Sequence, residues 1–215
     1  MKKVIRLILV LLLTVFIPTI SSANFISNPG FESYTPPGNF SDWTEGGSIL
    51  VNTDPQFVYE GSASAFLRIP GGSLYQGFTI TDGSSLYYGA WFRIATDSFA
   101  SNWDQIQISL QIDSLPWTTI GGSVGNILSA SDFAWYQSYN SYFSDWFLVA
   151  NTVPVSSIPM NAQININAQN TDAELTKVFV DGAFANSVSV PEPASLLLLG
   201  LGLMGLAGVR RKILK

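Results

Sequence analysis

The middle of the chain alternates apolar and polar side chains at every second position. The pattern is clearest in residues 105–113, where Ile106, Ile108, Leu110 and Ile112 are separated by polar residues, and it recurs in 162–168. Strict alternation puts the apolar side chains on one face, which is typical of a half-buried antiparallel strand. Further β-rich runs occupy residues 64–69, 74–80, 86–95, 146–153 and 175–180.

Turn-forming residues separate these runs. The clearest are Pro70-Gly71-Gly72, the segment 81–85 and Gly121-Gly122. Many short strands joined by such turns indicate a sandwich or a jelly roll. We therefore predict an all-β fold: a single jelly-roll β-sandwich over residues 24–186, flanked by an N-terminal signal helix and a C-terminal hydrophobic helix.

The first 23 residues have the layout of a secretory signal peptide. Lys2, Lys3 and Arg6 precede an apolar run at 7–17, and Ser21-Ser22-Ala23 supplies small residues for cleavage after Ala23. The alternative is an uncleaved membrane anchor. As a helix the apolar run would reach only about 17 Å, well short of a hydrocarbon core of ~30 Å, which favours the signal peptide.

The last 29 residues, 187–215, form a second accessory segment. A Val-Pro-Glu-Pro motif at 190–193 precedes a run without charge at 194–209 and a basic end at 210–215. As a helix the run reaches about 24 Å, and the basic end would remain on the cytoplasmic side. We expect these residues to hold the chain in the membrane transiently, with the domain outside.

This order of features resembles the PEP-CTERM sorting signal of Gram-negative bacteria. The resemblance implies an exosortase as processing partner, with cutting near Pro191, Glu192 and Pro193, and delivery to the cell surface or the extracellular space. A plain C-terminal anchor with a proline-rich stalk is the alternative.

Composition narrows the chemistry of the middle segment. Residues 24–190 contain fourteen acidic residues against three basic ones, Arg68, Arg93 and Lys177, a formal charge of −11. Such a segment repels phosphate backbones, so we expect no nucleic-acid partner. The chain has no cysteine and no histidine, which excludes disulfides, a Ser-His-Asp triad and the usual zinc ligands.

The landmarks of the middle segment resemble the galactose-binding-like β-sandwich of carbohydrate-binding modules. They are the opening at 24–32 (Asn-Phe-Ile-Ser-Asn-Pro-Gly-Phe-Glu), Trp43, the turn at 60–64, Tyr75-Gln76, the strand at 87–93 and Phe179-Val180-Asp181. The resemblance implies a structural Ca²⁺ ion held by Glu32 and Asp181, since Ca²⁺ prefers carboxylate and carbonyl oxygens. The alternative is that both residues are solvated carboxylates at strand ends.

Aromatic residues supply the candidate ligand-binding site. Eight of them lie between Phe133 and Phe147, and aromatic faces can stack on the apolar faces of sugar rings. The predicted ligand-binding residues are Trp117, Trp135, Tyr136, Tyr139 and Tyr142. The alternative is that these aromatic residues belong to the core or cover a sheet edge.

The leading functional prediction is an exported, non-catalytic surface or extracellular protein that contacts polysaccharide, such as an exopolysaccharide matrix. A structural or adhesive surface protein without a small ligand is the second possibility. A glycoside hydrolase or lyase using two carboxylates is the third, although no acidic pair stands in a recognisable motif.

Overall fold

The computed structural model describes residues 24–96, 105–169 and 177–188. In this part the chain forms antiparallel strands and three very short helices: a 3-10 helix at Pro55–Phe57, α2 (Val124–Ile127) and a 3-10 helix at Ala130–Asp132. The strands are β1 (Thr44–Asn52), β2 (Ser64–Ile80), β3 (Ser85–Thr96), β4 (Gln105–Ile112), β5 (Thr118–Ser123), β6 (Phe133–Tyr136), β7 (Ser141–Ser144), β8 (Phe147–Pro154), β9 (Met160–Gln169) and β10 (Lys177–Val188).

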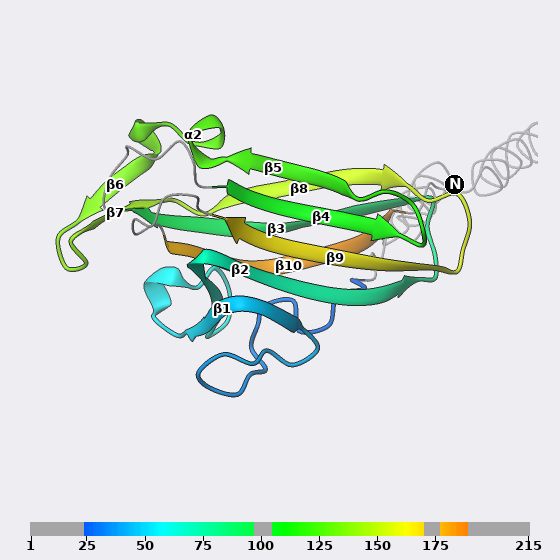
Figure 1. Ribbon diagram of the computed structural model, residues 1–215, viewed down its shortest axis with the longest axis horizontal. Helices are drawn as coiled ribbons and strands as arrows, with labels where there is room; N and C mark the ends of the chain where they lie inside the picture. The colour runs from blue at the N-terminus through cyan, green and yellow to red at the C-terminus, as the bar shows by residue number, and fades with distance from the viewer. Residues whose placement is uncertain (1–23, 97–104, 170–176, 189–215) are drawn as a thin grey trace, which may run out of the picture.

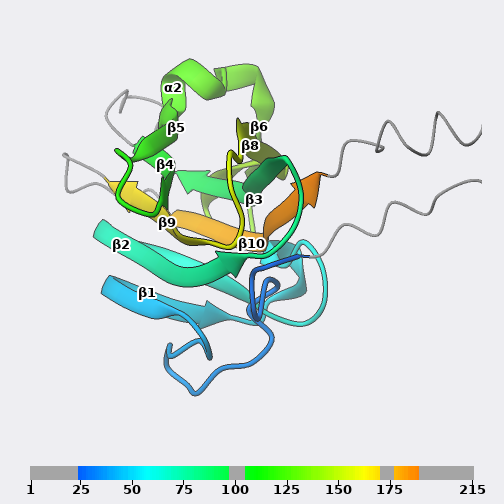
Figure 2. The ribbon, with the colours of Figure 1, turned by 90° about the vertical axis from the view of Figure 1, so that its right-hand side faces the viewer.

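The strands form one continuous hydrogen-bonded sheet that folds over into two layers (Figure 1). Its order is β5-β4-β9-β2-β10-β3-β7-β6, with β1 paired to β2 and β8 paired to β3. The long strand β2 joins the layers, because residues 65–67 pair with β10 while residues 71–80 pair with β9. In Figure 2 the layer of β4, β9, β2 and β1 lies to the left and that of β3, β8 and β10 to the right. The predicted all-β sandwich is thus confirmed.

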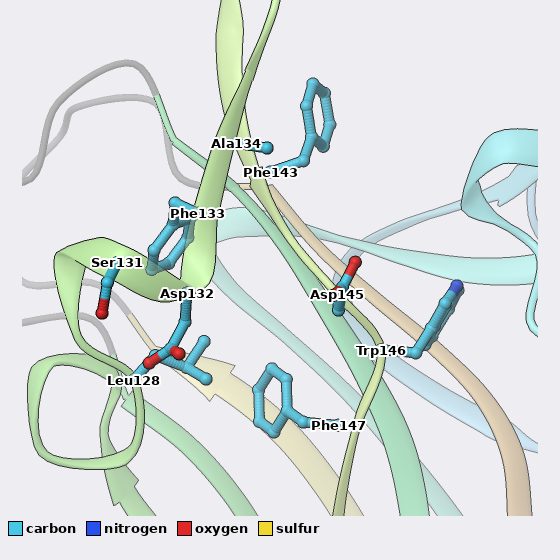
Figure 3. A pocket seen from close by; sticks show the side chains of 9 residues that line it. All are labelled: Leu128, Ser131, Asp132, Phe133, Ala134, Phe143, Asp145, Trp146 and Phe147. Carbon is cyan, nitrogen blue, oxygen red and sulfur yellow. The ribbon is translucent and has the colours of Figure 1, made fainter.

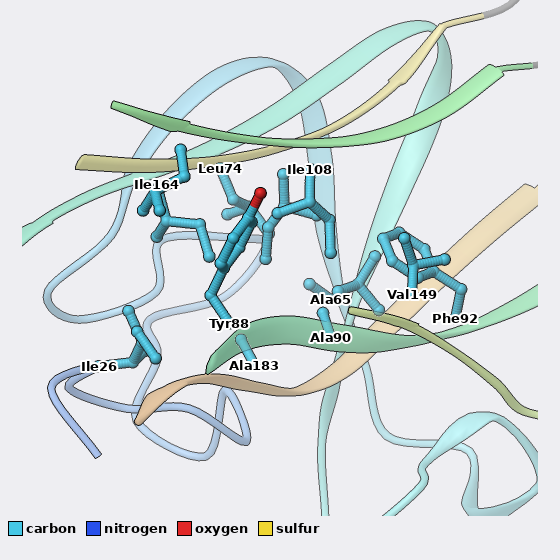
Figure 4. Close-up of a cluster of buried hydrophobic side chains, with 14 of the residues drawn as sticks. Ile26, Ala65, Leu74, Tyr88, Ala90, Phe92, Ile108, Val149, Ile164 and Ala183 are labelled. Atoms are coloured by element: carbon cyan, nitrogen blue, oxygen red, sulfur yellow. The ribbon is translucent and has the colours of Figure 1, made fainter. Parts of the chain in front are cut away.

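The alternating segments form the strands that the pattern predicts. In β4 and β9, Ile108 pairs with Ile166 and Leu110 with Ile164, and all four side chains are buried. They meet Tyr88 and Phe92 of the opposite layer in one apolar core (Figure 4). Burial of these apolar surfaces is the main favourable contribution to folding.

The predicted turn at Pro70-Gly71-Gly72 is wrong. The strand continues through it, and the register with β1 jumps from Gly47 opposite Gly72 to Ser48 opposite Arg68, so that residues 69–71 bulge out. A bulge accommodates a proline because the unpaired position needs no amide donor. The Gly121-Gly122 turn is wrong as well, since both glycines lie inside β5. Of the predicted turn at 81–85, by contrast, residues 81–84 do connect β2 to β3, which begins at Ser85.

The N-terminal end of the described chain is fixed to its last strand. Asn24 forms a bridge with Asn186, and the Phe25 amide donates to the Ala185 carbonyl at 2.8 Å. The described residues between 24 and 188 contain both layers of the core and anchor their own first residues, so we expect segment 24–188 to fold by itself. The predicted signal helix (1–23) and hydrophobic helix (194–209) lie outside the described residues. Among the residues described, no helix is long and apolar enough to cross a membrane.

Tyr88 is the polar exception in the core. Its hydroxyl is buried without a well-formed hydrogen bond among the described residues, and burial raises the pKa of Tyr88, against a smaller lowering by the Asn151 side chain. An unsatisfied buried hydroxyl costs roughly 1–3 kcal/mol. We expect Tyr88→Phe to raise the free energy of unfolding by about 1 kcal/mol in urea titrations. A loss of stability would instead show that the hydroxyl bonds to Asn151, which faces Tyr88 across β3 and β8.

Candidate functional site

The aromatic segment folds into a hairpin of β6 and β7. Its turn spans residues 137–140, with Asn140 in the left-handed region (φ 49°) and the Tyr139 amide bonded to the Tyr136 carbonyl. Trp135 stands directly opposite Tyr142, and Tyr136 opposite Ser141. Because side chains alternate between the faces of a strand, the aromatic residues separate into two sets.

The first set packs against the body of the protein. Tyr136 and Tyr139 both meet Phe143 edge-on, and Tyr139 also contacts Phe57 at 5.1 Å between ring centroids. The Tyr139 hydroxyl donates to Asp54 Oδ2 at 2.6 Å, which raises the pKa of Tyr139 and lowers that of Asp54. Tyr139 thus attaches the hairpin to the loop before β2.

Arg93 packs against the same face of the hairpin. Its guanidinium carbon lies 5.5–5.8 Å from the ring centroids of Phe57, Tyr136 and Phe143. Its Nε donates to the Ser144 carbonyl at 3.0 Å, and the side chain is buried. Cation–π contacts of this kind stabilise a buried guanidinium.

The other predicted ligand residues lie elsewhere. Trp135 and Tyr142 pair on the opposite face of the hairpin, 4.7 Å apart between centroids, with Trp135 48% exposed. Trp117 is 42% exposed and precedes β5, whose far end leads through α2 towards the hairpin. A six-residue strand spans about 20 Å. The structure therefore divides the five predicted residues among three places instead of one surface.

A hollow opens beside the hairpin instead (Figure 3). Its volume is about 360 Å³, within the range usual for small-ligand sites. Asp132 and Phe133 lie on one side, and Asp145, Trp146 and Phe147 on the other. The remaining lining residues are Leu128, Ser131, Ala134 and Phe143. We call this cavity the hairpin hollow. It combines aromatic walls with two carboxylates.

Trp146 packs against a stack of two other aromatic side chains. Tyr59 meets the Trp146 ring edge-on at 5.7 Å and stacks on Trp91 at 4.3 Å between ring centroids. Trp91 lies on β3, so the stack connects the wall of the hollow to the sheet. The position of Trp146 therefore depends on the loop that carries Tyr59.

Glu32 and Asp181 fix that loop. Asp181 Oδ2 accepts hydrogen bonds from the amides of Tyr59 (2.8 Å) and Glu60 (3.2 Å), and Oδ1 accepts from Gly182 (2.7 Å). Glu32 Oε1 accepts from the amides of Ser62 (2.8 Å) and Ala63 (3.1 Å). The Ser62 hydroxyl donates to Glu32 Oε2. The two predicted metal ligands thus hold opposite ends of one loop, residues 59–63.

Glycine is required at the centre of this loop. Gly61 has a φ of 80°, and a Cβ there would collide with Glu32 Oε1. Gly30 leaves room between the two carboxylates, since an ideal Cβ on it would lie 3.7 Å from Asp181 Oδ1 and 4.0 Å from Glu32 Oε1. Both acids therefore face a small space beside Gly30.

The two carboxyls differ in electrostatics. Desolvation raises the pKa of the fully buried Asp181 to about 6, and the nearby Glu60 charge adds to this, against the three amide donors. For the exposed Glu32, desolvation is the largest single influence and raises the pKa, but the hydrogen bonds from the Ser62 hydroxyl and from the amides of Ser62 and Ala63 together outweigh it and lower the pKa. No basic side chain of the described part forms an ion pair with Asp181.

A cation beside Gly30 would suit this charge, but the two acids do not form a complete site. Each of their four oxygens already accepts a protein hydrogen bond. Ca²⁺ takes six to eight oxygen ligands, and the described residues contain no group of three or more acidic side chains that could hold a metal. The remaining ligands would have to be carbonyls or water.

Solved structures of similar fold are carbohydrate-binding β-sandwiches. The module TmCBM61, determined with β-1,4-galactotriose, has a TM-score of 0.52 and 14% identity, covering 76% of this chain and 98% of that one. The enzymatically active domain of tailspike protein 4 from bacteriophage CBA120 has a TM-score of 0.51 and 16% identity, covering 77% of this chain and 21% of that one. The xylan-binding domain CBM22-1 from Paenibacillus barcinonensis Xyn10C reaches only 0.43, with 11% identity over 79% of this chain and 97% of that one.

The chain also carries the PEP-CTERM protein-sorting motif, matched at residues 189–212. The predicted processing residues Pro191, Glu192 and Pro193 lie within this match, and the motif implies an exported protein directed to the cell surface. No curated protein sequence is similar enough to this chain to count as a relative. At these identities the similar structures establish the fold of the domain and nothing about its ligand.

Sequence reasoning missed the residues that line the hollow. Trp146, Phe133 and Phe147 were within the aromatic segment but not among the predicted ligand-binding residues, and Asp132 was not singled out. The available signal was the position of Asp132 and Asp145 at the two ends of the segment, just before β6 and just after β7. In an antiparallel hairpin these two positions come together.

Proposed function

We propose that this protein is exported, processed by an exosortase near Pro191-Glu192-Pro193, and binds polysaccharide non-catalytically at the cell surface or outside the cell. The observation that carries the proposal is the hairpin hollow. Phe133, Trp146 and Phe147 provide faces on which a sugar ring can stack, and Asp132 and Asp145 provide hydrogen-bond acceptors for its hydroxyls. The sorting motif and the carbohydrate-binding-module fold support the cellular context.

Two carboxylates in one hollow raise the alternative of a glycoside hydrolase. Such an enzyme needs one carboxyl kept protonated by apolar burial, to act as general acid. Asp132 and Asp145 are both exposed, and hydrogen bonds from the Ser129 amide and hydroxyl lower the pKa of Asp132. These features favour binding without hydrolysis.

A glycan array tests the proposal. Segment 24–188 should bind at least one class of bacterial or plant polysaccharide when calcium is present, and reducing-end assays should detect no cleavage of the bound glycan. Absence of binding to every glycan would contradict the ligand claim. Release of reducing ends would establish an enzyme instead.

Calcium binding beside Gly30, between Glu32 and Asp181, is a second part of the proposal. Unpaired negative charge on the buried Asp181 and its neighbour Glu60 supports it. At one hundred times Kd, a bound ion stabilises by about 2.7 kcal/mol. This predicts a rise in melting temperature of roughly 5–10 °C over EGTA. Asp181→Asn should abolish the difference, and an unchanged melting temperature in the native protein would contradict calcium binding.

One observation favours an adhesive function as a second candidate. The outward face of β4, β9 and β2 is uncharged, and the Oδ1 atoms of Asn165 and Asn167 are buried there with no hydrogen-bond partner in the part of the chain that the structure describes. The face, which we call the amide face, consists of Gln105, Gln107, Ser109, Gln111, Asn161, Gln163, Asn165, Asn167, Ser73, Tyr75, Gly77 and Thr79. Sedimentation showing self-association that Gln107→Lys abolishes would support adhesion, and a monomer at all concentrations would contradict it.

A further inference from the structure

The charges that line the hairpin hollow are all of one sign. Asp132 and Asp145 stand on opposite sides of it, and no basic side chain lines it. Of the three basic residues in the described part, Arg93 contacts the lining residue Phe143, with its guanidinium carbon 5.7 Å from the ring centroid, but its side chain is buried and does not itself line the hollow. The hollow therefore has negative charge that nothing within it neutralises.

Both carboxylates retain oxygens for a ligand. Asp145 is exposed and has no hydrogen-bond or ion-pair partner among the described residues. Asp132 uses Oδ2 to accept from the Ser129 amide and hydroxyl, each at 2.7 Å. These bonds lower the pKa of Asp132, so it is ionised at neutral pH and its Oδ1 stays available as an acceptor.

The aromatic walls of the hollow also favour a ligand that combines a cationic group with an apolar surface. The rings of Phe133, Trp146 and Phe147 offer faces on which sugar C–H groups can stack and which attract a nearby ammonium. A bare metal ion would use only the carboxylates of this lining, because the aromatic walls supply no oxygen ligands for it. A sugar ring that carries an ammonium group can contact the aromatic walls through its C–H groups and bind the carboxylates through its charge.

We propose that the hairpin hollow recognises an amino sugar in its cationic form, as found in a de-N-acetylated glucosamine polymer. The inference deepens the proposed carbohydrate binding and rests on it. The ammonium would lie between the carboxylates of Asp132 and Asp145, forming charge-assisted hydrogen bonds, while the aromatic residues of the lining contact the sugar ring. A neutral N-acetylated ring would lose these bonds, and a uronic-acid ring would be repelled.

Isothermal titration of segment 24–188 with two matched tetrasaccharides tests the inference. The glucosamine tetramer should bind at least tenfold more tightly than the N-acetylglucosamine tetramer, which has the same backbone without the charges. Asp132→Asn combined with Asp145→Asn should remove this difference, with the melting temperature showing that the fold is kept. Asp82→Asn, a matched exposed acid in the turn between β2 and β3, should leave it unchanged.

The other outcomes separate this inference from the proposed function. Equal binding of both tetramers, or binding of the neutral one alone, would overturn the amino-sugar assignment and keep carbohydrate binding. Equal binding of a tetralysine peptide would show unspecific attraction of cations and would also overturn it. If neither tetramer bound while other glycans bound on the array, the amino-sugar assignment would be rejected. If no glycan bound at all, the proposed carbohydrate binding itself would be rejected.

Discussion

Replacing Trp146 with alanine is expected to weaken glycan binding by segment 24–188 at least tenfold. The change removes the largest aromatic wall of the hairpin hollow. Loss of one stacked aromatic face costs roughly 1–2 kcal/mol of binding energy, and 1.4 kcal/mol corresponds to a factor of ten in Kd. Titration calorimetry with the glycan selected on the array measures this effect directly.

Trp135→Ala is the matched control for this experiment. Trp135 belongs to the same hairpin, but it pairs with Tyr142 and does not line the hollow. Its replacement should change Kd less than twofold. If Trp135→Ala abolished binding and Trp146→Ala did not, the ligand would lie beside Trp135 and Tyr142, and the hollow would not be the site.

Raising the pH from 4 to 7 in EGTA is expected to destabilise the native protein relative to Asp181→Asn by about 2–3 kcal/mol. Burial raises the pKa of Asp181 from 3.8 to about 6. Below pH 3.8 the carboxyl is protonated in both folded and unfolded states. Between pH 3.8 and 6 the unfolded state releases its proton first, so stability falls as pH rises, at 1.36 kcal/mol per pKa unit.

Comparison with Asp181→Asn isolates this one group. Glu32 contributes with the opposite sign, because its lowered pKa gives stability that is lost as pH falls below its ordinary value of 4.5. That contribution is present in both proteins and cancels in the difference. Urea unfolding at several pH values provides the free energies. A difference that does not vary with pH would contradict the raised pKa of Asp181.

The strands of the core could be predicted from the sequence because their signal is local. The alternation of apolar and polar residues, at 106–112 in β4 and at 162–168 in β9, indicates which face of each strand is buried. The bulge at residues 69–71 and the Gly121-Gly122 pair could not be predicted in the same way. Glycine and proline end a strand or interrupt it depending on the partner strand, which the local sequence does not contain.

The site was only partly predictable for a similar reason. The sequence indicated the aromatic segment 133–147, but whether each ring packs inward or faces a cavity depends on the pairing of β6 with β7 and on contacts to Phe57 and Arg93. Those partners are 40 or more residues away along the chain. Glu32 and Asp181 were found through resemblance, and the structure adds what they hold: the loop that carries Tyr59 behind Trp146.

The most direct test of the account is an NMR titration of ¹⁵N-labelled segment 24–188 with the glucosamine tetramer. We predict that the largest shifts fall on the Trp146 indole N–H and on the backbone amides of residues 131–134 and 143–147, which surround the hollow. Shifts confined to the amide face of β4 and β9, or no shifts with a glycan shown to bind by calorimetry, would contradict the assignment of the hairpin hollow as the binding site.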